Sequence, residues 1–353
     1  MIRIGDKLIG KSNPSYFIAD IAANHDCDLT RAKELIHLAK ESGADCAKFQ
    51  HFKASKIVSD KGFKNSKNLN SHQTSWKKSV FEIYKEFELN REWNEELANT
   101  AKLAGIDFMT TPYDFEAVDS VNPYVFAWKI GSGDITYTQL IEYIANTNKP
   151  IMLATGASSL EDVRRAVNLI LSNNKNLILM QCNTNYTGSV ENFKYINLNV
   201  LKLYTKEFPT AILGLSDHSP GHSTVLGAIA LGASVIEKHF TDDNNREGPD
   251  HSFSLNPKSW YEMVQRSREI KAALGDGIKR VEDNEINTSI LQQRCIRINK
   301  DLATGHLITK NDLEVLRPAT LGAIKPYEIN NVIGKRLLSN LEAGDPLYFK
   351  DIE

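Results

Sequence analysis

The segments AILGLSD (residues 211–217) and VIEKHFT (residues 235–241) decide the fold of this chain. Each is a short run of apolar and β-branched residues that ends in polar ones, which is typical of a strand. The apolar runs are too continuous for a sheet with one face in water, so we expect strands that are buried on both faces. Segments with helical periodicity lie between such runs, and this alternation predicts a parallel α/β fold.

Six further runs of the same kind precede these two, which makes eight candidate strands before residue 245. Helical periodicity is clear in residues 32–39 and 163–170, and Ser159 and Asp162 precede the second of these in capping-box spacing. Eight such units match the size of a (β/α)8 TIM barrel. A doubly wound sheet would carry a glycine-rich loop after its first strand, and none follows Ala22. The other six candidate strands are residues 16–22, 46–50, 107–112, 128–132, 150–156 and 177–182.

The length of 353 residues predicts two unequal domains, because a single core stops growing near roughly 250 to 300 residues. We assign residues 1–275 to the barrel, with its last helix at residues 259–274. Residues 276–289 belong to the polar stretch GDGIKRVEDNEINTS and are predicted to be a linker. Residues 290–353 contain the short strand-like pieces CIRIN, LEVLRP and GKRLLS, so we expect a small β-rich domain.

The composition favours small-molecule chemistry. The 42 basic and 44 acidic residues leave a formal charge of −2, so no net field is present to hold nucleic acid or a membrane surface. The 4 cysteines form no C-x-x-C pair, which argues against disulfides and cysteine-based zinc sites. No signal peptide or membrane-spanning run is evident. We therefore expect a cytoplasmic protein.

Polar residues close every candidate strand, and barrel enzymes gather their chemistry at these ends. His218 and His239 follow the seventh and eighth strands, which are neighbours in a closed barrel. Two imidazoles there predict one divalent metal ion, with coordination positions left open for water and substrate.

Lys48 and Lys129, in AKFQ and WKIGS, lie among apolar neighbours near strand ends, which favours an anion site over snorkelling to solvent. Neutral donors near other strand ends would add to it, since a phosphate beside a carboxylate needs many donors. These donors are Ser132, Thr155, Asn183 and Ser216.

Asp20 and Glu237 are candidates for acid–base work or for holding substrate hydroxyls. The alternative is that they orient the two histidines. The segment REGPDHSFSLNP (residues 246–257) is typical of a loop over an active site, and Asp250 within it is a candidate sugar contact.

The sequence resembles the sialic acid synthase family, which includes N-acetylneuraminate synthase and its pseudaminate and legionaminate relatives. The resemblance covers almost the whole chain. The motifs that carry it, in order, are IADIAANH, AKFQ, WKIGSGD, ATG, LMQCNTNY, GLSDH, IEKHFTDDNNREGPDH and LRP.

The resemblance implies an antifreeze-like (SAF) domain at the C-terminus and a domain-swapped homodimer in which this domain covers the partner's site. It implies that His218 and His239 hold Mn²⁺, with Mg²⁺ or Co²⁺ as alternatives. The residues that it implies for phosphoenolpyruvate binding are Lys48, Lys129, Ser132, Asn183 and Ser216. Those that it implies for sugar binding are Gln50, Asp134, Tyr186, Asp250 and Arg317. The implied catalytic residues are Lys48, Lys129, Asp20 and Glu237.

The implied reaction joins phosphoenolpyruvate to the open-chain aldehyde of N-acetylmannosamine or a 2,4-diacetamido-2,4,6-trideoxyhexose. Water adds to the enol carbon, with Asp20 or Glu237 taking its proton, and loss of phosphate leaves a nonulosonic acid. Asp20 and Asp134 stand where glutamate is usual in the N-acetylneuraminate enzymes, and Ala154 replaces a serine, so the sugar stays open. The alternatives are a metal-dependent aldolase or sugar isomerase on the same barrel, or a non-catalytic sugar-binding relative.

Overall fold

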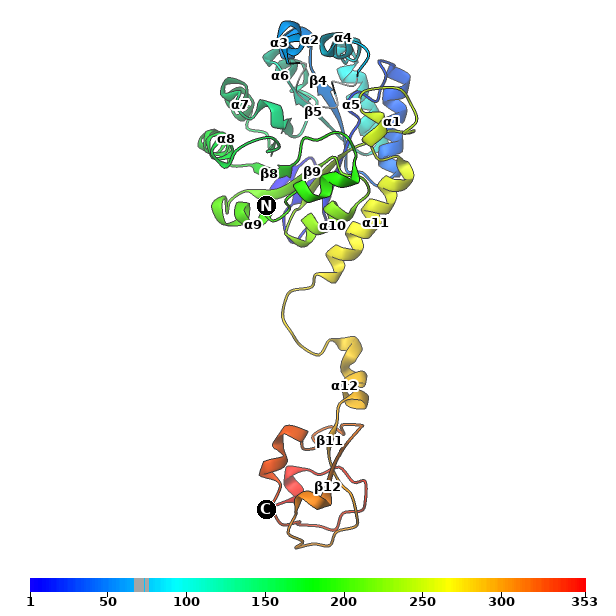
Figure 1. Cartoon of the computed structure of the whole chain (residues 1–353), viewed down its shortest axis with the longest axis vertical. Coiled ribbons are helices and arrows are strands. Elements are labelled where there is room, and N and C mark those ends of the chain that lie inside the picture. Colours follow the sequence, from blue (N-terminus) through cyan, green and yellow to red (C-terminus); the bar gives the residue numbers. More distant parts are fainter. Residues whose placement is uncertain (67–72, 74–75) are drawn as a thin grey trace. The chain divides into compact units, whose positions relative to one another are not determined.

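The computed structural model describes residues 1–66, 73 and 76–353, and the chain divides into two compact units, Met1–Gly275 and Asp276–Glu353. In the first unit, eight parallel strands form a closed barrel in which each pairs with the next and the last pairs with the first, as the sequence predicted (Figure 1). The strands are β3 (Tyr16–Asp20), β4 (Cys46–His51), β5 (Asp107–Pro112), β6 (Trp128–Ile130), β7 (Ile151–Ala154), β8 (Leu177–Cys182), β9 (Ile212–Asp217) and β10 (Val235–His239).

Helices surround the barrel, and their apolar faces supply its outer core (Figure 1). Helix α8 (Leu160–Asn173) begins at the predicted capping box, in which Ser159 and Asp162 bond each other's backbone N–H. The predicted last barrel helix is α11 (Pro257–Ala273). The other helices of this unit are α1 (Leu29–Glu41), α2 (Ala54–Ile57), α3 (Asp60–Asn65), α4 (Val80–Glu86), α5 (Asn94–Ala104), α6 (Phe115–Val121), α7 (Thr138–Ala145), α9 (Val200–Glu207) and α10 (Ser223–Ala230). No described helix has the length and apolar character needed to cross a membrane.

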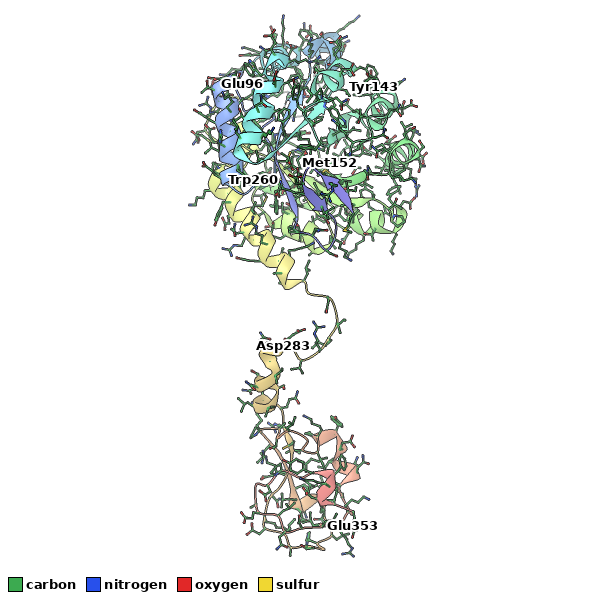
Figure 2. The ribbon with its side chains drawn as sticks, turned by 180° about the vertical axis from the view of Figure 1, so that it is seen from behind. Glu96, Tyr143, Met152, Trp260, Asp283 and Glu353 are labelled. Atoms are coloured by element: carbon green, nitrogen blue, oxygen red, sulfur yellow. The ribbon has the colours of Figure 1, made fainter. Side chains whose placement is uncertain are left out.

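A hairpin that the sequence did not predict closes the N-terminal end of the barrel. Strands β1 (Ile2–Ile4) and β2 (Lys7–Ile9) pair with each other, and their isoleucines are buried against the apolar residues inside the barrel, including Met152. Figure 2 shows the hairpin strands near the labelled Met152, whereas Trp260 on α11 belongs to the outer core. The barrel interior is therefore filled largely by apolar side chains at this end, and the polar strand ends lie at the other.

The second unit has its own small core around the antiparallel strands β11 (Cys295–Ile298) and β12 (Leu313–Leu316). Helix α12 (Ile286–Gln292) begins inside the range 276–289 that we predicted to be a linker. The predicted strand-like piece GKRLLS forms only isolated bridges, at Arg336 and Leu337.

Candidate active site

Alternation along the strands decides which polar residues face the barrel interior. Apolar residues such as Tyr16, Ile18 and Val235 fill the lower layers inside the barrel. Two residues further along their strands come Asp20 and Glu237, so these carboxylates project into the same interior, one layer higher. The strand register sets Asp20 opposite both Lys48 and His239.

The first buried ion pair joins Lys48 and Asp20, with 2.7 Å between Nζ and Oδ2 and only 1% and 3% of the side chains exposed. Gln50 Nε2 donates to the same carboxylate at 3.1 Å, and Lys48 Nζ donates to Thr111 Oγ1 at 3.2 Å. Burial alone would raise the pKa of Asp20, but the charge and hydrogen bond of Lys48 lower it to about 2. Asp20 is therefore ionised at neutral pH.

The second buried ion pair joins Lys129 and Glu237, with 2.6 Å between Nζ and Oε1. Ser216 Oγ donates to the same carboxylate oxygen at 3.1 Å. Burial opposes ionisation of Glu237, yet Lys129 and Lys48 hold its pKa below the usual range. Its other oxygen, Oε2, is buried without a hydrogen-bond partner among the described residues and can accept from a bound ligand.

His218 and His239 lie together, with 5.4 Å between their ring centroids. His218 Nδ1 lies 2.8 Å from the carbonyl oxygen of Asn183, to which it must donate, so its Nε2 is the nitrogen able to bind a metal. His239 Nδ1 is buried without a partner among the described residues. Burial lowers the pKa of His218 to about 4 and that of His239 to about 3, so both are neutral at pH 7.

A cavity of about 340 Å³ opens above these groups. Two carboxyl groups in its lining have raised pKa values, because burial lifts Asp134 to about 6 and Asp250 to about 7. The backbone N–H of Ala23 donates to Asp250 Oδ2 at 3.1 Å and holds that loop at the mouth. Of the predicted site residues, the cavity is lined by Gln50, Ser132, Asp134, Tyr186, His239 and Asp250.

Tyr186 links the cavity to the histidines. Its ring centroid lies 4.2 Å from that of His218, and Phe253 packs against both Tyr186 and His239 at centroid distances of 5.7 and 4.9 Å. Apolar contact on the imidazoles explains much of their burial.

The remaining predicted residues form hydrogen bonds with other groups or lie outside the barrel. Thr155 Oγ1 donates to the carbonyl oxygen of Met180 at 3.0 Å and accepts from Tyr204, so its hydroxyl proton is already used. Ser132 Oγ accepts from the N–H of Gly156 at 2.9 Å and keeps its own proton to donate. Asn183 follows β8, and its Nδ2 donates to the carbonyl oxygen of Tyr195 at 3.3 Å. Arg317 belongs to the second unit, directly after β12.

Several residues that shape the site were not assigned to it from the sequence, although Thr111 stood out as one of the polar residues that close the third predicted strand. Thr111 contacts Lys48, while Phe52, Tyr84 and Tyr113 line the cavity. Phe52 and Tyr113 directly follow β4 and β5, and that position was the available signal.

The fold and this site define a (β/α)8-barrel enzyme with a small β-rich unit after the barrel. Residues 35–279 match the NeuB family, and residues 293–353 match the SAF domain. The chain therefore belongs to the NeuB family, which agrees with the resemblance to sialic acid synthases found in the sequence and with the C-terminal SAF domain that it implied.

Individual relatives match nearly the whole chain. An N,N'-diacetyllegionaminic acid synthase of Legionella pneumophila is 37% identical over 99% of this chain and 98% of its own length. The human N-acetylneuraminate-9-phosphate synthase is 32% identical over 96% and 93% of the two chains. A solved N-acetylneuraminic acid (sialic acid) synthetase of Leptospira borgpetersenii, in complex with citrate, superposes with a TM-score of 0.71 at 27% identity, over 81% of this chain and 94% of that chain.

Proposed function

We propose that this enzyme condenses phosphoenolpyruvate with an N-acylated amino-hexose and water to give a nonulosonic acid and phosphate. The observation that carries the proposal is the pair of buried lysines beside two neutral histidines at one barrel end. Its relatives, which are named N,N'-diacetyllegionaminic acid synthase and N-acetylneuraminate-9-phosphate synthase, support it.

The charges in the barrel mouth favour an anionic substrate together with a cation. Lys48 and Lys129 carry two positive charges, and Asp20 and Glu237 carry two negative ones, so these four groups sum to zero. A phosphoenolpyruvate trianion bound there needs further positive charge and neutral donors. Ser132 keeps a hydroxyl proton to donate, Ser216 would donate to the substrate only by releasing Glu237, and a divalent ion would supply the charge.

We propose that His218 and His239 hold that ion, with Mn²⁺ preferred and Mg²⁺ or Co²⁺ as alternatives. The residues fit a metal, because both rings are neutral and His239 Nδ1 is a buried nitrogen without a partner among the described residues. The described residues contain no group of three or more His, Cys, Asp or Glu side chains that could hold an ion, so water or substrate would complete the coordination. When bound, the ion would polarise the acceptor aldehyde as a Lewis acid.

The chain's own residues position the reactants and move protons. Lys48 and Lys129 hold phosphoenolpyruvate so that its methylene carbon faces the aldehyde carbon, and the new C–C bond forms between these two atoms. The aldehyde oxygen takes up a proton, and water adds to the former enol carbon. Asp20 or Glu237 accepts a proton from that water, and the C–O bond to phosphate then breaks to leave the keto acid.

The acceptor sugar would lie in the cavity above. Gln50, Asp134, Tyr186 and Asp250 present the polar groups that can bind its hydroxyl and amide N–H groups. We propose that Arg317 joins them from the partner subunit of a domain-swapped homodimer. Support comes from exposed apolar side chains in the second unit, such as Leu321 at 83% and Tyr327 at 80%, which suit an interface. Light scattering tests the dimer, and recovery of activity on mixing Arg317→Ala with His218→Ala chains tests the sharing of sites.

We also propose that the enzyme works in the cytoplasm, since all four cysteines are free.

The test of the reaction is phosphate release from phosphoenolpyruvate with Mn²⁺ and each candidate sugar. We expect release that requires the sugar, stops with a chelator, and is lost in the His218→Ala, His239→Ala double variant. An aldolase or isomerase would convert its sugar without phosphoenolpyruvate. If folded, metal-loaded protein released no phosphate with N-acetylmannosamine or with a diacetamido-trideoxyhexose, the condensation would be wrong for these acceptors.

A further inference from the structure

Behind the two histidines lies a buried cluster of polar side chains that the proposed reaction does not use. We call it the Lys238 cluster, and it consists of Asp217, Ser219, Thr224 and Lys238, all of which are buried. Asp217 and Lys238 are register partners on β9 and β10. Because Glu237 and His239 face the barrel interior, alternation directs Lys238 outward, toward helix α10, which carries Thr224. The cluster therefore lies outside the lining of the cavity.

The hydrogen bonds of the cluster meet at one carboxylate. Lys238 Nζ lies 2.6 Å from Asp217 Oδ2, and the hydroxyl groups of Ser219 and Thr224 donate to the same oxygen at 2.9 and 2.7 Å. Asp217 Oδ1 accepts from the backbone N–H of Ser219 at 3.2 Å. Lys238 Nζ also donates to the carbonyl oxygen of Ser219 at 2.6 Å. These bonds occupy both charged groups, so neither is placed to bind a substrate.

The cluster holds the chain on both sides of His218. Asp217 and Ser219 flank that histidine in the sequence, and Lys238 directly precedes His239. The register between β9 and β10 ends at Asp217 and Lys238, so the strand pairing stops before the two histidines. The bonds from Lys238 to Asp217 and Ser219 therefore connect the backbone at one imidazole to the backbone at the other.

Stability alone is a weak reason for these buried charges, because replacing a buried ion pair with apolar residues is often neutral or stabilising. Metal-binding histidines, in contrast, depend on neighbouring groups that fix the orientation of their rings. Loss of such a group typically weakens metal binding by about 10- to 100-fold.

We propose that Asp217 and Lys238 are positioning residues that fix the distance between His218 and His239 and thereby set the affinity of this pair for a divalent ion. The inference rests on the proposed function, in which the two histidines hold that ion. The imidazole rings, with centroids 5.4 Å apart, keep this spacing while the cluster ties the two strand ends together.

The experiment titrates Mn²⁺ into substrate-free protein and measures free Mn²⁺ by electron paramagnetic resonance. The main variant, Asp217→Asn with Lys238→Met, removes both charges, so that neither is left buried alone. Thr224→Val removes one hydrogen bond to Asp217 and keeps the ion pair. The His218→Ala, His239→Ala double variant shows how much of the binding belongs to the histidines.

Ile4→Ala is the control for a general loss of stability, because Ile4 is fully buried in the apolar core at the other end of the barrel. Circular dichroism shows which variants are folded, and urea unfolding ranks their stability.

The expected result is Mn²⁺ binding that is about 10- to 100-fold weaker in the main variant, weaker by a smaller factor in Thr224→Val, and unchanged in Ile4→Ala. If the main variant does not fold, Thr224→Val decides. Unchanged Mn²⁺ affinity in the folded cluster variants, or an equal loss in Ile4→Ala, would overturn the inference and leave the proposed metal site intact. Mn²⁺ binding to the unaltered protein that does not depend on His218 and His239 would instead remove that metal site, so the two failures are distinguishable.

Discussion

The Lys129–Glu237 pair shows how strongly single residues are constrained at the barrel mouth. The two side chains are only 4% and 5% exposed, so neither charge has water to replace its partner. Replacing one partner of such a pair lowers the free energy of unfolding strongly. Replacing both partners lowers it much less.

We expect Lys129→Met to abolish activity with phosphoenolpyruvate and to destabilise the fold by about 3–5 kcal/mol, because Glu237 is left buried and unpaired. Urea unfolding and phosphate release measure the two effects. In the control, Lys129→Met with Glu237→Gln, much of the stability should return without activity. A double variant as unstable as the single one would contradict this account.

The second prediction concerns how the carboxyl group of Asp134 makes the stability of the fold depend on pH. Its pKa is raised to about 6 by burial, so the folded state keeps a proton that the unfolded chain releases near its ordinary value of 3.8. The folded protein therefore loses stability as pH rises from about 4 to 6, and the loss is complete above pH 6. In Asp134→Asn this loss is absent. The difference in melting temperature between the variant and the unaltered protein should grow across that interval and then level off, and a pH-independent difference would refute it.

At the scale of elements, one carboxylate fastens the loop after β10 to the loop after β3. Asp26 accepts from Arg246 at 2.6 Å and lies 2.9 Å from His251 Nε2 and 3.1 Å from Arg31 Nε. Asp26 has a φ of 49°, in the left-handed region that residues other than glycine rarely adopt. Its three charged partners hold the turn in this conformation. Asp250, which lines the cavity, lies between Arg246 and His251 in the sequence.

We expect Asp26→Asn to raise the KM for the sugar at least several-fold with little effect on the KM for phosphoenolpyruvate, since the loop that carries Asp250 loses its charged anchor. Steady-state kinetics with each substrate varied in turn measure this. Asp119→Asn is the control, because it neutralises an exposed carboxylate outside the cavity lining and keeps an oxygen that accepts from Tyr143. Equal increases in both KM values would point to a general loss of structure.

At the scale of the whole molecule, the N-terminal hairpin completes the barrel core. Ile4 is fully buried, whereas Leu8 on the same hairpin is 42% exposed. We expect Ile4→Ala to lower the free energy of unfolding by about 2–5 kcal/mol and Leu8→Ala to change it much less. Urea unfolding of both variants measures this. A small effect of Ile4→Ala would mean that the barrel is stable without the hairpin.

Much of this architecture could be predicted, because each barrel strand is an apolar run whose polar end is visible in the sequence. The same argument located Lys48, Lys129, His218 and His239, since parallel strands bring their ends to one face. The hairpin was missed because its strands, IRI and KLI, are three residues long and too short for periodicity to show.

The sequence by itself determined the barrel, the end of the barrel at which chemistry gathers, and the residue types that gather there. Only the tertiary structure decided how these residues pair. It placed Lys238 against Asp217 at 2.6 Å, a buried ion pair beside the site residues, and directed Glu237 and His239 on the same strand into the barrel. It also brought Ile57 and Ile83, on helices α2 and α4, into the lining of the cavity. The physical reason is that alternation and strand spacing are local properties of the chain, whereas a cavity depends on which distant side chains pack together.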